Sequence, residues 1–90
     1  MAGRWFEQFE VGQVFEHEIR RTVTESDNTW FCAATYNPAA IHIDHEYCKG
    51  TEWGRPLVNS LFTLGLVIGL SVQDTTLGTT VANLGMTDTR

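Results

Sequence analysis

One stretch decides the fold of this chain: NSLFTLGLVIGLSVQ, residues 59–73. It carries no charge, and its apolar residues fall on all sides of a helical wheel, which is typical of a helix buried in a core. Asn59 or Ser60 supplies the cap, so we predict a helix over Leu61–Val72. The polar and small residues within the stretch disfavour a membrane-spanning segment.

The half of the chain before this helix shows two further patterns. Residues 14–23 alternate between two faces, which predicts a strand with one face partly exposed to water. Thr24 stands three residues before Asp27, the spacing of a helix start. We place Trp30, Phe31, Ala33 and Ala34 on one face of that helix. It should end at Asn37-Pro38, because the residue before a proline is pushed out of the helical conformation.

The connections around the apolar helix complete the pattern. We expect Ala39–Asp44 to be extended, Asp44 to cap a short helical turn through Cys48, and residues 51–56 to form a loop. Residues 74–78 should turn, and residues 79–86 should form a second strand. Two strands cannot cover a helix that is apolar all round, because a two-stranded sheet is only marginally stable. More sheet must come from elsewhere.

Composition bounds the class of protein. The chain has 90 residues, 42% of them apolar and 19% charged, which fits one small globular domain. Its net charge of −5 argues against binding to nucleic acid and against a polybasic membrane anchor. Two cysteines are too few for a disulfide framework, and no leader pattern opens the chain, so we expect a cytoplasmic protein.

The densest cluster of polar side chains lies between residues 37 and 48 and allows three interpretations. His42, His45 and Cys48 are metal-ligand types, but a structural zinc site normally needs a second close pair of ligands, and the chain supplies none. We therefore predict no metal site in this cluster. In the second interpretation His42 is an ordinary packed histidine and Asp44 only a helix cap.

The third interpretation is proton transfer beside a carbonyl group. His42 lies between Ile41 and Ile43, which would hold its ring, and imidazole titrates near neutral pH. Asn37 stands five residues earlier, at the predicted helix end, where its amide is placed to orient a water molecule or a carbonyl group. The free backbone N–H groups where the apolar helix begins, at Asn59-Ser60, are suited to a developing oxyanion.

These residues also resemble a known family. The runs Trp5–Gln13, Arg21–Asp27, Asn37–Asp44 and Gly54–Leu61 are similar to the MaoC-like hydratases, whose fold is the hotdog fold. Residues 58–70 and 74–86 are most similar to the mesaconyl-CoA hydratase (β-methylmalyl-CoA dehydratase) branch of that family. The resemblance covers nearly all of residues 1–90.

The resemblance implies an α+β fold, an antiparallel sheet wrapped around a long helix, here about Ser60–Val72. It implies a hydro-lyase that adds water to a 2-enoyl-CoA or removes it from a 3-hydroxyacyl-CoA, and that needs no metal and no redox cofactor. His42 matches the family histidine, and Asn37 stands where the family commonly has aspartate. Because an amide cannot transfer a proton as a carboxylate does, His42 would act alone as the base.

The remaining site residues follow from the resemblance for Ser60 and from position in the sequence for Asp44 and Arg55. The backbone N–H of Ser60 would bind the enolate oxygen, at a position where many members have His-Gly in place of Asn59-Ser60. Asp44 would be a reserve acid or would orient the ring of His42. Arg55 is either a solvated loop charge or a contact for a coenzyme A phosphate.

Alternatives to a hydratase stay open. Hotdog folds also host acyl-CoA thioesterases, although Leu61–Val72 has no carboxylate for that chemistry. A non-catalytic or truncated acyl-CoA-binding chain is the third possibility. Since a hotdog needs several strands after its long helix, we expect residues 1–90 to be the N-terminal part of one MaoC-like domain. A homodimer or higher homo-oligomer would complete the site.

Overall fold

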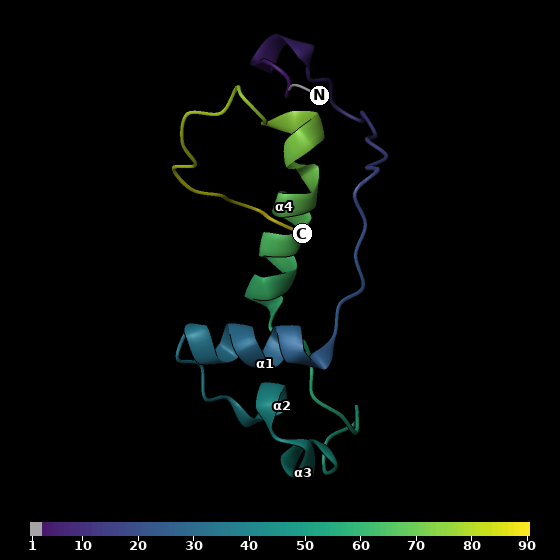
Figure 1. The fold of residues 1–90 in the computed structure, drawn as a ribbon, viewed down its shortest axis with the longest axis vertical. Helices are drawn as coiled ribbons and strands as arrows, with labels where there is room; N and C mark the ends of the chain where they lie inside the picture. Colours follow the sequence, from purple (N-terminus) through teal and green to yellow (C-terminus); the bar gives the residue numbers. More distant parts are fainter. Residues whose placement is uncertain (1–2) are drawn as a thin grey trace. The chain divides into compact units, whose positions relative to one another are not determined.

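The computed structural model describes residues 3–90 and contains five helical elements (Figure 1). These are η1 (Phe6–Gln8), α1 (Glu25–Ala34), α2 (Ala40–Ile43), α3 (His45–Cys48) and α4 (Ser60–Thr75). The chain divides into two compact units. One contains the N-terminal residues through Ile19 together with Gly69–Arg90, and the other contains Arg20–Ile68. Helix α4 contributes residues to both.

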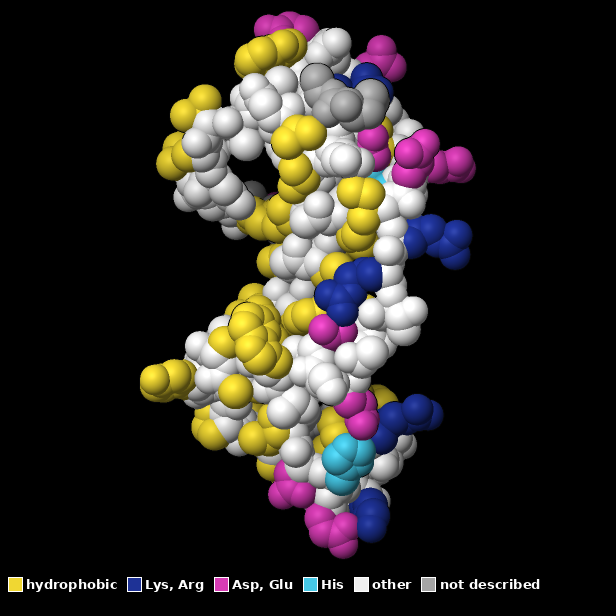
Figure 2. Space-filling view, in the orientation of Figure 1, with side chains coloured by type: hydrophobic (Ala, Val, Ile, Leu, Met, Phe, Trp, Pro, Cys, Tyr) yellow, Lys and Arg dark blue, Asp and Glu magenta, His cyan; other side chains and the backbone are white. Residues whose placement is uncertain are grey.

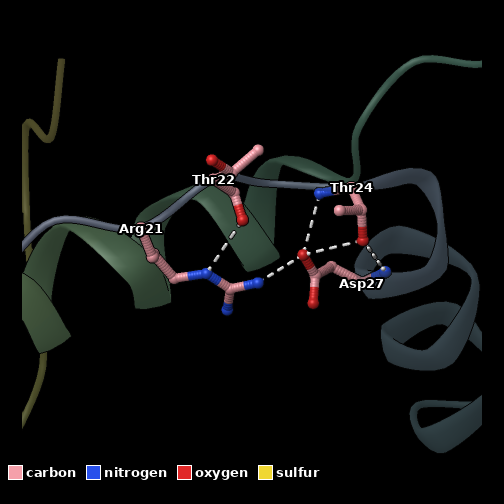
Figure 3. A network of polar contacts seen from close by, with 4 residues as sticks. All are labelled: Arg21, Thr22, Thr24 and Asp27. Carbon is pink, nitrogen blue, oxygen red and sulfur yellow. Dashed lines mark hydrogen bonds and ion pairs between the residues drawn. The ribbon is translucent and has the colours of Figure 1, made fainter.

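The start of α1 follows the sequence prediction. The Thr24 side chain accepts a hydrogen bond from the backbone N–H of Asp27, and the Asp27 carboxylate accepts one from the Thr24 N–H at 2.9 Å. Arg21 forms an ion pair with the same carboxylate (Figure 3). Together these contacts lower the pKa of Asp27, with the Arg21 hydrogen bond as the largest cause.

Helix α1 ends earlier than predicted. Its last residue is Ala34, and Tyr36 adopts a left-handed backbone conformation with φ of 58°. The N–H of Asn37 bonds to the Cys32 carbonyl at 2.9 Å, and the Tyr36 N–H bonds to the Ala33 carbonyl at 3.2 Å. This pair of bonds is a Schellman motif, which ends the helix before Pro38 is reached.

The buried face of α1 also differs from the prediction. Asn28 and Cys32 are its buried residues, whereas Trp30 is 71% exposed and Ala33 and Ala34 are exposed. The spacing of four residues places Asn28 and Cys32 one above the other on the helix. The prediction used apolar residues alone and therefore missed Asn28, the polar residue that is buried.

Helix α2 replaces the extended segment predicted for Ala39–Asp44, and that prediction is wrong. The Asn37 side chain accepts from the Ala39 N–H at 3.0 Å, and helical bonds follow from His42 to Ala39 and from Asp44 to Ala40. The local turn set by Asn37 thus prevails over the alternating pattern. The next prediction is confirmed: Asp44 caps α3, accepting from Glu46 N at 2.9 Å.

Helix α4 begins where predicted and continues three residues further, to Thr75. Asn59 is its cap, since Asn59 Oδ1 accepts from Leu61 N at 2.9 Å. Its predicted burial is not observed within residues 3–90, where Leu61 and Val67 are 63% and 60% exposed. Apolar side chains are prominent on the surface in Figure 2. In the described part of the chain, no helix combines the length and apolar character needed to cross a bilayer.

The unit that joins the two ends of the chain is held by backbone bonds and one half-buried pair. Gly3 N donates to Leu77 O at 2.6 Å, and His17 Nδ1 lies 2.6 Å from Asp74 Oδ2.

The alternation predicted from residue 14 onward is partly visible, because Phe15 and His17 are half-buried between exposed neighbours. Across residues 3–90 neither predicted strand, 14–23 or 79–86, takes part in a β-ladder. Each would need a neighbouring strand to satisfy its backbone groups.

Candidate functional site

The ring of His42 is held in one orientation by a backbone carbonyl. His42 Nδ1 lies 2.9 Å from the oxygen of Leu57. A carbonyl oxygen only accepts, so Nδ1 carries the proton and donates it. The neutral imidazole then has its lone pair on Nε2, which has no hydrogen-bond partner among residues 3–90. A half-buried imidazole in this tautomer is equipped to accept a proton from a water molecule.

A buried amide from α1 supports this arrangement. Asn28 is 5% exposed, and its Nδ2 donates to the carbonyl oxygens of His42 at 3.0 Å and Leu57 at 3.1 Å. Its Oδ1 accepts from the backbone N–H of Asn59 at 2.9 Å. Asn28 thus joins α1 to the helix that carries His42 and to the segment that enters α4.

Sequence reasoning missed Asn28. The available signal was an amide one helical turn before Cys32, the position from which a side chain on the same face reaches a neighbouring segment. Amides at such positions are usually exposed, so burial was the information that the sequence lacked.

The beginning of α4 presents a backbone donor. Asn59 is 4% exposed and forms two hydrogen bonds that fix it. Its backbone N–H donates to the Asn28 side chain, and its side-chain oxygen accepts from Leu61 N. The exposed Ser60 follows as the first residue of the helix, and within residues 3–90 its N–H has no acceptor. Such N–H groups at a helix N-terminus favour negative charge. The Asn28 and Leu57 contacts therefore link His42 to the region of Ser60.

The other predicted site residues serve different local roles. Asn37 uses its side-chain oxygen for the Ala39 N–H, and no hydrogen bond in the described chain joins it to His42. Asp44 is engaged in capping α3, and it is the Leu57 carbonyl that orients the His42 ring. Arg55 is exposed in the loop before α4, without a charged partner among residues 3–90.

The potential metal ligands point to separate partners. His45 Nε2 lies 3.1 Å from Glu25 Oε1. Cys48 is fully buried, with Sγ 3.6 Å and 3.4 Å from the carbonyl oxygens of Ala40 and Ile41. Burial, with a smaller effect from the Asp44 charge, raises the pKa of this thiol. Residues 3–90 contain no group of three such side chains placed to hold a metal ion, and they enclose no pocket.

Comparisons with known proteins agree with one another. The family described as MaoC like domain matches residues 6–90. The chain is 30% identical over 89 residues to the mesaconyl-CoA hydratase of Cereibacter sphaeroides, and 30% identical over 83 residues to the beta-methylmalyl-CoA dehydratase of Chloroflexus aurantiacus. These matches cover 99% and 92% of this chain but 26% and 23% of the relatives.

A solved structure is similar as well. The crystal structure titled monoamine oxidase regulatory protein from Archaeoglobus fulgius matches with a TM-score of 0.77 and 26% sequence identity. The match covers 98% of this chain and 60% of that one. The fold of this chain is therefore similar to that of part of a longer protein.

Proposed function

The chain belongs to the MaoC-like domain family, and from that premise we propose that it adds water to the double bond of a 2-enoyl-CoA, or catalyses the reverse dehydration. It spans about a quarter of the length of its two curated relatives, a hydratase and a dehydratase by name. We propose that these 90 residues contribute to this reaction.

One observation carries the proposal: the hydrogen bond from His42 Nδ1 to the Leu57 carbonyl. It leaves Nε2 as the basic nitrogen, which is the state that a general base needs before it takes a proton.

The reaction then follows in two steps. His42 Nε2 takes a proton from a water molecule as the water oxygen forms a bond to C3 of the enoyl thioester. The electrons of the double bond shift toward the thioester oxygen, and the Ser60 N–H stabilises the resulting enolate. The proton held on His42 Nε2 is then delivered to C2, which completes the addition of water and restores the neutral imidazole. Asn37, whose Oδ1 is occupied by Ala39, has its Nδ2 left to orient the attacking water.

The proposal extends to the substrate and to the surroundings of the site. The names of the relatives favour mesaconyl-CoA and β-methylmalyl-CoA as the substrate pair. Asn59 would position the donor of Ser60, and Asp44 and Arg55 would lie at the edge of the site, with Arg55 available to a coenzyme A phosphate. We also propose the antiparallel sheet of a hotdog fold around α4, and a homodimer or higher homo-oligomer. The proposed location is the cytoplasm, where free thiols such as Cys32 and Cys48 stay reduced.

The test is an assay of the purified natural protein with mesaconyl-CoA and with simple 2-enoyl-CoAs. Hydration removes the ultraviolet absorbance of the conjugated thioester without releasing free thiol. We expect that loss of absorbance. Release of free coenzyme A thiol without hydration would instead identify a thioesterase, and binding without turnover would identify a non-catalytic acyl-CoA-binding protein. Either result would refute the proposal.

A further inference from the structure

The buried side-chain amide of Asn28 forms three hydrogen bonds to backbone groups outside its own helix. It lies on α1, yet none of its three strong bonds is made within α1. Two of them go to the carbonyls of His42 and Leu57, and the third receives the N–H of Asn59. These partners are the backbone of the proposed base, the acceptor for its ring, and the residue before the proposed oxyanion donor.

We propose that Asn28 is a positioning residue of the hydration reaction, setting both the tautomer of His42 and its placement relative to the Ser60 N–H. This inference rests on the proposed function. Asn28 acts through other groups, since its contacts are with backbone atoms and not with the reacting atoms.

The Leu57 carbonyl connects Asn28 to the ring of His42. Its oxygen accepts from both Asn28 Nδ2 at 3.1 Å and His42 Nδ1 at 2.9 Å. A carbonyl has two lone pairs, so it can hold both donors at once. The second Asn28 bond, to the His42 carbonyl, fixes the backbone from which the ring extends. Ring and acceptor are thus held by one amide group, and Nδ1 has a defined acceptor that keeps its proton in place.

The side-chain oxygen of Asn28 holds the start of α4, where the proposed oxyanion donor lies. Asn28 Oδ1 receives the Asn59 N–H at 2.9 Å, and Asn59 is the cap of α4. Because Ser60 is the next residue, the direction of its N–H depends on how Asn59 is held. Among the described residues, Asn28 is the side chain that hydrogen-bonds, at 3.1 Å or less, both to the backbone around the His42 ring and to the start of α4.

Asn28→Asp separates the two sides of the amide. Aspartate has nearly the same shape and retains an acceptor for the Asn59 N–H, but an ionised carboxylate cannot donate to the His42 and Leu57 carbonyls. We expect the Leu57 carbonyl to move from the ring, and His42 to gain the Nε2–H tautomer. With the base misplaced and its lone pair on the wrong nitrogen, kcat should fall about 100-fold while KM changes by less than about twofold.

Cys32→Ala is the matched control. Cys32 is buried one turn along the same face, with Sγ 3.8 Å from both Asn28 Oδ1 and Asn59 Nδ2. Its removal loosens the packing of α1 without removing a backbone hydrogen bond of Asn28. We expect a loss of stability with the His42 tautomer unchanged.

The decisive readout is the nitrogen NMR spectrum of the His42 imidazole in the purified natural protein, measured with kcat and KM. A folded Asn28→Asp protein that loses the Nδ1–H tautomer, beside a Cys32→Ala protein that keeps it, supports the inference. A folded Asn28→Asp protein that retains the tautomer overturns it, whatever its kcat. If Asn28→Asp does not fold, Asn28→Ser is judged by the same criterion. Absence of hydration by the wild-type protein would refute the proposed function, whereas the tautomer would still decide the role of Asn28.

Discussion

Replacement of the α4 cap tests how this site is held together. Asn59→Ala removes the oxygen that accepts from Leu61 N at 2.9 Å, and leaves the backbone bond from Asn59 N to Asn28 intact. Loss of an N-cap costs about 1 kcal/mol. The Asn59 side chain is also packed, since the residue is only 4% exposed, and its truncation costs roughly another 1 kcal/mol. We therefore expect the free energy of unfolding to fall by about 2 kcal/mol.

Urea unfolding of the purified protein measures this change, with an unchanged m-value as the sign that the unfolding reaction is the same. Asn59→Ser restores a capping oxygen and should recover about 1 kcal/mol of the loss. Asn83→Ala is the control, because Asn83 Oδ1 accepts from Gly85 N at 3.0 Å in an exposed turn. We expect it to change stability by less than about 0.5 kcal/mol. Equal stability of the Asn59→Ala and Asn59→Ser proteins would refute the reasoning.

Three further predictions concern α1 and α3. Tyr36→Gly should raise the free energy of unfolding by about 0.5–1 kcal/mol in a urea titration, because Tyr36 has φ of 58° and is 91% exposed; a loss of stability would contradict this. The lowered pKa of Asp27 contributes stability that is present above its ordinary value of 3.8 and is lost as pH falls through the lower folded value. Asp27→Asn should thus flatten the stability profile between about pH 5 and pH 2, and an unchanged slope would refute the role of the carboxylate. Because burial raises the pKa of the Cys48 thiol, a thiol reagent near pH 8 should modify Cys48 in the unfolded chain and spare it in the folded one; equal rates would show that it is accessible.

Local signals in the sequence predicted the helix starts well. Thr24 with Asp27, Asp44 and Asn59 each cap the helix that was expected to begin after them. Caps can be predicted because the side chain and the N–H that it receives lie within three residues of each other. The histidine that the motif singled out also proved to have a defined ring orientation.

Other features depended on contacts that no local pattern contains. The segment at residues 40–43 alternates like a strand but forms a helix, because the turn at Asn37 directs the chain into one. Asn28 became visible only when the chain brought together residues 28, 42 and 57. The predicted strands at 14–23 and 79–86 need partners distant in sequence, and the described residues supply none.

The central claim is that His42 is the general base of a hydration reaction, and the kcat of His42→Gln tests it most directly. Glutamine keeps a side chain capable of hydrogen bonding but cannot take up a proton. His45→Gln is the control, since exposed His45 lies three residues away and pairs with Glu25. With mesaconyl-CoA as substrate, we predict that His42→Gln lowers kcat by at least about 100-fold and that His45→Gln leaves it within about twofold. A folded His42→Gln protein that hydrates mesaconyl-CoA at the wild-type rate would contradict the claim.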